Sequence, residues 1–240
     1  MRFFFFILVA GALGLSAGAA YFFFGDRPPP PLMIKFLAYE AELKKYLPAA
    51  RAGSANAQYA VARTAHRSEL EFRNTVKVMA WYRKSADQGH VGAQYALGMM
   101  HFTGEGTAQD YRRAADWFRL AAGLGLHRGA QFRLGELYFY GRGVPHSYGE
   151  ATNWYRKAAN GGHPIAQYVL GRMFKEGWGV DKDHIEALKW LSLAIPHVKR
   201  IQAHDPQLNP VREREKLLAS MNRSQIELAK KRIKAWKPDR

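Results

Sequence analysis

The stretch LGELYFYGRGVPHSYGEATNWYRKAANGG, Leu134 to Gly162, decides the fold of this chain. It starts with apolar residues at helical spacing, meets Gly141-Arg142-Gly143, and then resumes a helical pattern. A Gly-x-Gly sequence after an apolar run can cradle a phosphate group, or it can end a helix and turn the chain. The remainder of the sequence decides between these two interpretations.

The same pattern recurs along the chain at intervals of 36 or 37 residues. One column of the repeat holds tryptophans: Trp81, Trp117, Trp154 and Trp190. The glycine pair recurs as Gly104-Glu105-Gly106, Gly141-Arg142-Gly143 and Gly177-Trp178-Gly179. A phosphate-binding loop would not recur with an acidic, a basic and an aromatic centre in turn. We therefore interpret the glycines as turn residues that need positive φ or the absence of a side chain.

Each repeat is predicted to contain two helices. The first runs from about Ala93 to Phe102 in the second unit and ends at the Gly-x-Gly turn. The second starts after a good N-cap residue, which is Asn74, Asp110, Ser147 or Asp183. It is predicted to end near Gly89, Gly125 and Gly162.

Small residues inside the first helices predict close helix packing. Gly98, Gly135 and Gly171 each cost about 1 kcal/mol of helix propensity relative to alanine. We expect that these glycines let two helices pack closely together and that this packing offsets the cost. Because one unit cannot bury its apolar face alone, neighbouring units must stack, and we expect an all-α solenoid.

The repeat resembles a known family. Its motif is Ala-x-x-x-Leu-Gly, then an aromatic residue with x-x-Gly-x-Gly-Val, then Ala-x-x-Trp-Tyr-x-Lys-Ala-Ala-x-x-Gly, and it is similar to the Sel1-like repeat, a relative of the tetratricopeptide repeat. The resemblance covers about residues 53–196, with three well-matched units and a divergent first unit in which Ser68 and Leu70 replace the glycine pair. It implies a right-handed α-solenoid of about four two-helix repeats, of the kind found at the bacterial envelope.

The N-terminal segment 1–27 contains 22 consecutive uncharged residues, Phe3 to Phe24. A helix of this length is about 33 Å long and would span a bilayer, so we expect a single-pass inner-membrane anchor with the following domain in the periplasm. Cleavage of a signal peptide at Ala17-x-Ala19 is the alternative. Small residues on one face of the span predict pairing of two such helices into a dimer: Ala10, Gly14 and Gly18.

The flanks of the repeats are predicted to be helical caps. Residues 28–52 hold a proline-rich spacer and a cap helix from Ile34 to Ala50. In residues 197–240, Asn209-Pro210 is expected to open one helix and the capping box Ser224-Gln225-Ile226-Glu227 another. That last helix could instead lie on a membrane surface.

The charge of the chain favours acidic partners. Of the formal charge of +16, residues 197–240 carry +7, from twelve Lys or Arg and five Asp or Glu. An acidic protein or another anionic surface would complement this charge. Nucleic acid is disfavoured, because a membrane-anchored, exported domain does not meet it and the aromatic residues are taken up by repeat columns.

Residues suited to chemistry are scarce. The chain has no cysteine, and its nine histidines show no metal-ligand spacing. His90, His127 and His163 follow the helix-ending glycines at nearly equivalent columns, so the repeat explains them. There is no P-loop and no dinucleotide-binding fingerprint. The sequence therefore predicts no catalytic residue, no metal site and no cofactor.

What remains is the surface of the solenoid. In the related tetratricopeptide fold the first helices line the concave face, which implies a groove for a protein or peptide partner. By column, the groove would contain Tyr59, Arg63, His66, Tyr95, Met99, Phe102, Phe132, Glu136, Phe139, Tyr168, Arg172 and Lys175. The aromatic residues that recur in register, such as Tyr95 and Phe132, could equally belong to the core.

The expected function is therefore a non-enzymatic, membrane-anchored scaffold that holds a protein or peptide partner at the bacterial envelope. A narrower version is an immunity protein that neutralises a secreted effector. The alternative from another class is a protein that binds or hydrolyses an envelope glycan. A clustered pair of acids in the groove would favour that alternative, and the sequence places only Glu136 and Glu176 near it.

Overall fold

The computed structural model describes residues 31–67, 75–123 and 127–239. All regular secondary structure in these ranges is helical, which confirms the predicted all-α class. The chain divides into two compact units between Trp81 and Tyr82.

The first unit contains helices α3 (Pro31–Arg51) and α4 (Ala55–Arg67), which pack against each other. Helix α3 corresponds to the cap helix expected from Ile34 to Ala50. The side-chain amide of Gln58 on α4 donates a hydrogen bond to the carbonyl oxygen of Ala50 over 3.2 Å and is buried with it. This contact fixes the end of α3 against the start of the repeats.

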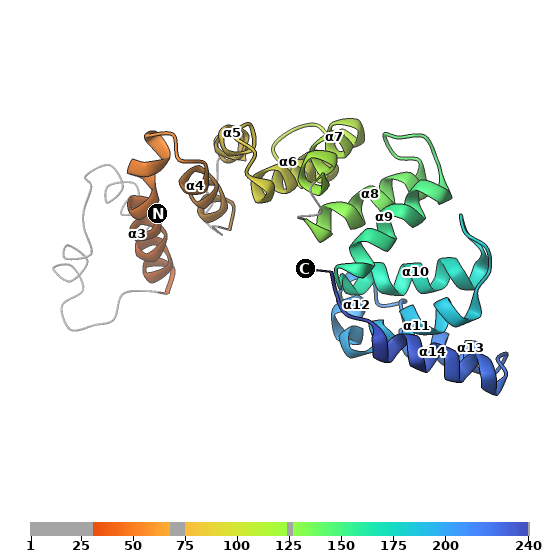
Figure 1. The fold of residues 1–240 in the computed structure, drawn as a ribbon. Helices are drawn as coiled ribbons and strands as arrows, with labels where there is room; N and C mark the ends of the chain where they lie inside the picture. The colour runs from red at the N-terminus through yellow and green to blue at the C-terminus, as the bar shows by residue number, and fades with distance from the viewer. Residues whose placement is uncertain (1–30, 68–74, 124–126, 240) are drawn as a thin grey trace. The chain divides into compact units, whose positions relative to one another are not determined.

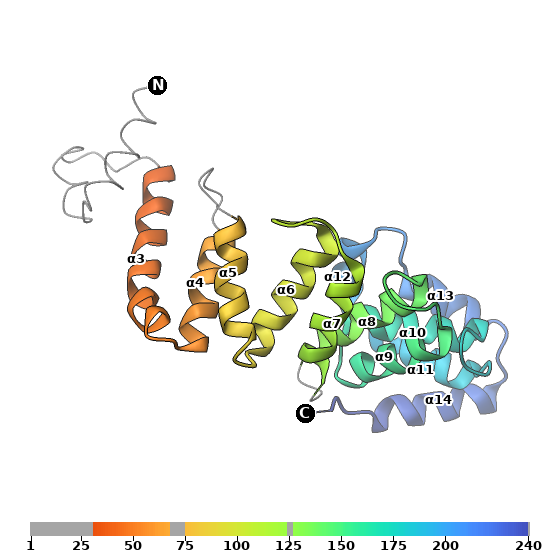
Figure 2. The same cartoon turned by 90° about the horizontal axis from the view of Figure 1, so that it is seen from above.

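Helix α5 (Thr75–Ala86) crosses the boundary between the units. The helices that follow are α6 (Val91–Thr103), α7 (Tyr111–Ala122), α8 (Arg128–Tyr140), α9 (Tyr148–Asn160), α10 (Pro164–Glu176), α11 (His184–Ala194), a 3₁₀ turn (Ile195–His197), α12 (Val198–His204), α13 (Pro210–Leu218) and α14 (Arg223–Ala235). In the second unit, α6 packs on α7, α8 on α9 and α10 on α11 (Figure 1). Helix α14 lies along α11 at the C-terminal end (Figure 2). This arrangement is the solenoid-like stack that the repeat predicts.

Glycines inside the first helices allow the two helices of a repeat to touch. An added Cβ atom at Gly135 would lie 2.6 Å from ring atoms of Tyr155 on α9. A Cβ atom at Gly171 would lie 2.8 Å from the side chain of Leu191 on α11. The predicted close approach is therefore confirmed, because no larger side chain fits without displacement of the partner ring or chain.

The Gly-x-Gly sequence is a turn and also a contact between repeats. Gly141 and Gly143 have φ angles of 64° and 70°, which are costly for any other residue. A Cβ atom at Gly143 would collide with the backbone of Tyr111 and Arg112 at the start of the second helix of the preceding repeat. The second glycine thus sets the distance between consecutive repeats, and the turn interpretation is confirmed.

The predicted N-caps of the second helices are present where the structure describes them. Asp110 accepts from the backbone N–H of Arg113 over 3.0 Å, and Ser147 accepts from that of Glu150 over 3.1 Å. Asp183 caps α11 in the same way. Asn74 lies outside the described residues.

The second helices end near the predicted glycines where the structure describes them. After α9, Gly162 has a φ of 83°, its N–H donates to the carbonyl of Ala159, and the next N–H, of His163, donates to that of Ala158. This is the hydrogen-bond pattern of a Schellman helix end with glycine at C′. Gly89, with a φ of 85°, closes α5 through the same pattern of bonds. Helix α7 ends at Ala122, and Gly125 lies outside the described residues.

The histidines that follow these turns are N-caps of the first helices. The Nδ1 atoms of His90 and His127 each accept a backbone N–H over 3.1 Å, and that of His163 accepts one over 3.3 Å. Burial lowers the pKa of His163 from 6.5 to about 4, so this cap is neutral at physiological pH. The repeat thus explains all three histidines through capping. In the described ranges, no three His, Asp or Glu residues are grouped as a metal site would require.

One capping prediction was wrong. The box that opens α14 is formed by Asn222 and Gln225, and not by Ser224 and Glu227. The Asn222 N–H donates to Gln225 Oε1 over 3.0 Å, and the Gln225 N–H donates to Asn222 Oδ1 over 2.9 Å. Asparagine is as good an N-cap as serine, and the helix gains two residues by starting earlier. Asn209 opens α13 as expected.

The predicted membrane span lies outside the described residues, and so do its pairing positions Ala10, Gly14 and Gly18. None of the helices within residues 31–239 that the structure describes is both long and apolar enough to cross a membrane.

Candidate peptide-binding pocket

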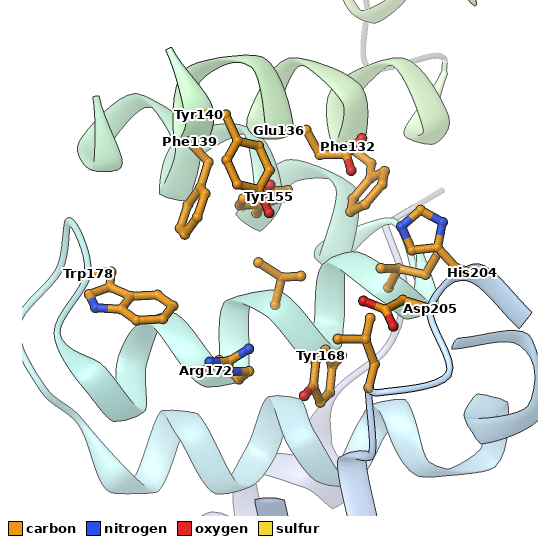
Figure 3. A pocket seen from close by; sticks show the side chains of 13 residues that line it. Phe132, Glu136, Phe139, Tyr140, Tyr155, Tyr168, Arg172, Trp178, His204 and Asp205 are labelled. Atoms are coloured by element: carbon orange, nitrogen blue, oxygen red, sulfur yellow. The ribbon is translucent and has the colours of Figure 1, made fainter. Parts of the chain in front are cut away.

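A pocket of about 210 Å³ opens between α8 and α10 in the second unit (Figure 3). Helices α8, α9 and α10 supply most of its wall, and the turn after α10 and the segment after α12 supply the rest. The lining residues are Phe132, Glu136, Phe139, Tyr140, Tyr155, Ile165, Tyr168, Val169, Arg172, Trp178, His204, Asp205 and Leu208.

Aromatic rings form one end of this pocket. The rings of Phe139 and Trp178 meet edge to face with centroids 5.7 Å apart. The guanidinium of Arg172 lies 5.3 Å from the centroid of the Trp178 ring. Trp178 also stacks on Tyr148 at 6.3 Å, and Tyr140 is 60% exposed. This end offers apolar faces and one cation to a ligand.

The C-terminal flank forms the other end. Helix α12 packs against α10, and its Ile201 is fully buried in the core. The ring of His204 meets that of Phe132 edge to face at 5.9 Å. Asp205, which follows α12, brings a second carboxylate to the pocket beside that of Glu136. The pocket is therefore closed on one side by a segment that does not belong to the repeats.

The tyrosine at the base of the pocket is the most buried of its polar groups. Tyr155 is 2% exposed and lines the pocket. Burial raises its pKa well above the usual value of 10, with a smaller effect of Glu136 in the same direction. The hydroxyl is therefore a neutral hydrogen-bond donor at any physiological pH.

The structure brings part of the predicted groove together. Five of the predicted residues line this pocket: Phe132, Glu136, Phe139, Tyr168 and Arg172. Phe132 and Tyr168 are also 3% exposed, so the alternative core interpretation holds for most of their surface. Phe139 and Arg172, whose positions vary between repeats, are half-buried and keep part of their surface open to the pocket.

The groove residues predicted in the second repeat lie on α6, outside the pocket. Tyr95, Met99 and Phe102 are half-buried and pack on the core formed by α7 and α8. The guanidinium of Arg133 lies 5.2 Å from the centroid of the Phe102 ring and 5.7 Å from that of Phe132. Arg133 therefore connects this group to the pocket.

The other predicted residues are elsewhere. Lys175 does not line the pocket, because its ammonium group pairs with Glu213 at 2.8 Å and with Glu176 at 3.2 Å. Tyr59, Arg63 and His66 belong to α4 in the first unit, where the Arg63 guanidinium lies 5.7 Å from the centroid of the Tyr59 ring.

Sequence reasoning missed eight of the lining residues. Trp178 is predicted only as the centre of a turn, and Tyr155 lies on a second helix, outside the columns that predict the groove. The aromatic centre of Gly177-Trp178-Gly179, where the other turns have charged centres, was a usable signal for Trp178. Nothing in the sequence indicated His204, Asp205 and Leu208. These residues follow the repeats, and the repeat pattern does not predict that the flanking segment packs back against them.

The helices described above define an all-helical, solenoid-like repeat protein. A family model described as Sel1 repeat matches residues 55–90, 91–126, 129–163 and 164–195. These segments cover more than half of the chain, so the chain belongs to the Sel1 repeat family. Proteins of this family are generally non-enzymatic scaffolds that bind protein partners.

Solved structures agree with this assignment. A protective antigen of uropathogenic Escherichia coli that displays an SLR fold is 30% identical, with a TM-score of 0.66 over 81% of this chain and 40% of that one. A Sel1 repeat protein from Oxalobacter formigenes is 27% identical, with a TM-score of 0.61 over 70% of this chain and 69% of that one. The chain thus spans well under half the length of the first of these structures. No curated protein matches it significantly.

An immunity protein from Pseudomonas aeruginosa is more distant. It is 18% identical, with a TM-score of 0.35 over 74% of this chain and 81% of that one. At this level of similarity it carries no argument for the immunity interpretation.

Proposed function

We propose that this chain is a non-enzymatic Sel1 repeat scaffold that holds a partner protein through a segment inserted into the pocket between α8 and α10. Residues 3–24 anchor it in the inner membrane, and the repeats lie on the periplasmic side. The observation that carries the proposal is the pocket itself, whose wall keeps half-buried Phe139, Trp178 and Arg172 available to a ligand. Aromatic and arginine side chains of this kind dominate the binding energy of many protein interfaces.

The carboxylates of the pocket do not favour hydrolysis. Glu136 is held by Arg133 at 2.6 Å, and the two side chains are only 17% and 20% exposed. This carboxylate is therefore engaged with a neighbouring side chain rather than presented to a ligand. Binding without chemistry is therefore the function that this geometry supports best.

Glycan binding is a second candidate with one observation in its favour. Asp205 and Glu136 both line an aromatic pocket, and carboxylates together with aromatic rings suit a sugar ligand. Under this alternative the rings of Trp178 and Phe139 would stack on a sugar face, and the carboxylates would accept hydrogen bonds from its hydroxyl groups.

Filling the pocket tests the proposal. Val169 is a half-buried lining residue on α10, so Val169→Phe should place a ring in the pocket without loss of the fold. Val76→Phe adds the same ring at a valine on α5 that is 67% exposed, and is the matched control. The full chain, purified in a mild detergent, would be used to capture cross-linked proteins from its source cells, with quantitative mass spectrometry as the readout.

We expect at least one protein that both the unmodified chain and Val76→Phe retain and that Val169→Phe loses. Equal retention by all three chains would show that the pocket is not the binding site. Sedimentation with isolated cell-wall sacculi, lost only in Val169→Phe, would establish the glycan alternative instead.

A further inference from the structure

Two charged groups of the pocket form no close ion pair among the described residues. Arg133 contacts Glu136, and Lys175 contacts Glu213. The Arg172 guanidinium has no carboxylate oxygen within 4 Å in the described ranges; it lies 5.3 Å from the centroid of the Trp178 ring and interacts with Tyr168. It also helps to lower the pKa of Glu213, whose carboxylate already contacts Lys175.

Asp205 remains as the negative counterpart. Its Oδ1 accepts the backbone N–H of Gln207 over 2.9 Å, and no Lys or Arg nitrogen of the described chain lies within 4 Å of the carboxylate. Figure 3 shows Arg172 and Asp205 on either side of Tyr168. The pocket thus presents a positive group at one end and a negative group at the other.

The rest of the wall is mostly apolar. Ile165 and Val169 line the pocket together with the aromatic rings of Phe139 and Trp178. Tyr155 also lines it, and burial keeps its hydroxyl a neutral hydrogen-bond donor. A ligand backbone carbonyl is a suitable acceptor for this hydroxyl.

We propose that the pocket takes a dipolar peptide segment. An acidic side chain of this segment pairs with Arg172, a bulky apolar side chain packs against the apolar wall, and a basic side chain pairs with Asp205. The proposal rests on the function proposed above and specifies the chemistry of the bound partner. A neutral sugar would offer neither group an opposite charge, and a nucleic acid would bring its phosphates to Asp205.

Synthetic peptides test this pattern directly. Because the direction of the bound chain is open, two dipolar probes are needed: acetyl-Glu-Ala-Phe-Ala-Lys-amide and acetyl-Lys-Ala-Phe-Ala-Glu-amide. A neutral probe replaces both charged residues with glutamine, and a second set replaces one at a time. Each carries the same fluorophore, and its Kd for the full chain in detergent is measured by fluorescence polarisation.

We expect one dipolar probe to bind at least about tenfold more tightly than the neutral probe, which corresponds to about 1.4 kcal/mol. Arg172→Gln should abolish the preference for glutamate over glutamine in the probe and leave the preference for lysine. Asp205→Asn should do the reverse. Lys157→Gln is the control, because this exposed lysine on α9 does not line the pocket, and it should change neither preference.

Two results would overturn the proposal in different ways. Equal Kd values for neutral and dipolar probes, with binding lost in Val169→Phe, would refute the dipolar ligand and leave the pocket as a peptide site. No binding of any peptide, together with a soluble cell-wall oligosaccharide that binds and is lost in Val169→Phe, would refute the peptide site as well.

Discussion

The packing of each repeat depends on a glycine where its two helices cross, and Gly135→Ala tests this most sharply. The new methyl group would lie 2.6 Å from two ring atoms of Tyr155 and 3.0 Å from a third. Carbon atoms approach to about 3.5–4.0 Å, so the ring or the helix must move by about 1 Å. Overpacking of this kind costs about 1–3 kcal/mol, against a gain in helix propensity of up to about 1 kcal/mol.

The net expectation is a loss of about 1–2 kcal/mol in the free energy of unfolding. For a protein of this size the melting temperature should fall by about 2–8 °C, followed by circular dichroism at 222 nm. Gly149→Ala is the control, because that helical glycine on α9 has no heavy atom closer than 3.9 Å to the added Cβ position. It should raise stability by about 0.5–1 kcal/mol.

A double substitution separates the clash from other effects. Tyr155→Leu removes the ring with which the new methyl group clashes. The double variant should therefore lose at least about 1 kcal/mol less unfolding free energy than the losses of the two single variants added together. If Gly135→Ala stabilised the protein as Gly149→Ala does, or if the two effects were simply additive, the close-packing explanation of these glycines would be refuted.

Further predictions concern the histidine cap and the C-terminal helix. Because burial lowers the pKa of His163 to about 4, the unfolded chain takes up a proton below pH 6.5 while the folded chain does not. The unfolding free energy should therefore fall by about 2 kcal/mol between pH 7 and pH 5 because of His163. His163→Ser can still cap α10, so this contribution should disappear from the pH dependence measured by urea unfolding. An unchanged pH dependence would contradict the prediction. Arg232→Ala breaks the ion pair with Glu186, a contact of 2.6 Å between α14 and α11, and should lower the melting temperature by about 2–4 °C. Trp236→Ala removes a ring that packs on Trp190 at 6.4 Å, and limited trypsin digestion should then release α14 faster than from the unmodified chain; an unchanged rate would show that the tail is not held there.

The fold could be predicted to a large extent because its signals are local. Glycines with positive φ, N-cap side chains and tryptophans recur every 36 or 37 residues, and each depends on its own turn or helix end. The prediction failed where two nearby residues could each have capped the same helix. At the start of α14, Asn222 and Ser224 are both good caps, and the sequence alone did not show that the helix would begin at the earlier one.

The pocket could be predicted only in part. Repeat columns correctly placed Phe139 and Arg172 on the first helices that face it. The other wall depends on the path of α12, whose buried Ile201 docks the flank on the repeats and brings Asp205 with it. The sequence also could not predict which charged side chains are paired. Lys175 is held away from the pocket by an ion pair with Glu213, which is 38 positions away in the sequence. Such long-range contacts leave no periodic trace in a sequence.

Site-specific photo-cross-linking in living cells can show whether the partner docks in the pocket between α8 and α10. A benzophenone amino acid would replace Tyr140, an exposed lining residue, or Lys231, an exposed residue on α14. We expect one adduct from position 140, which is lost when Val169→Phe fills the pocket. Its cross-linked segment should carry an apolar residue between an acidic and a basic one. Adducts from position 231 alone, or an adduct at position 140 that survives Val169→Phe, would contradict docking in this pocket and place the partner on another surface.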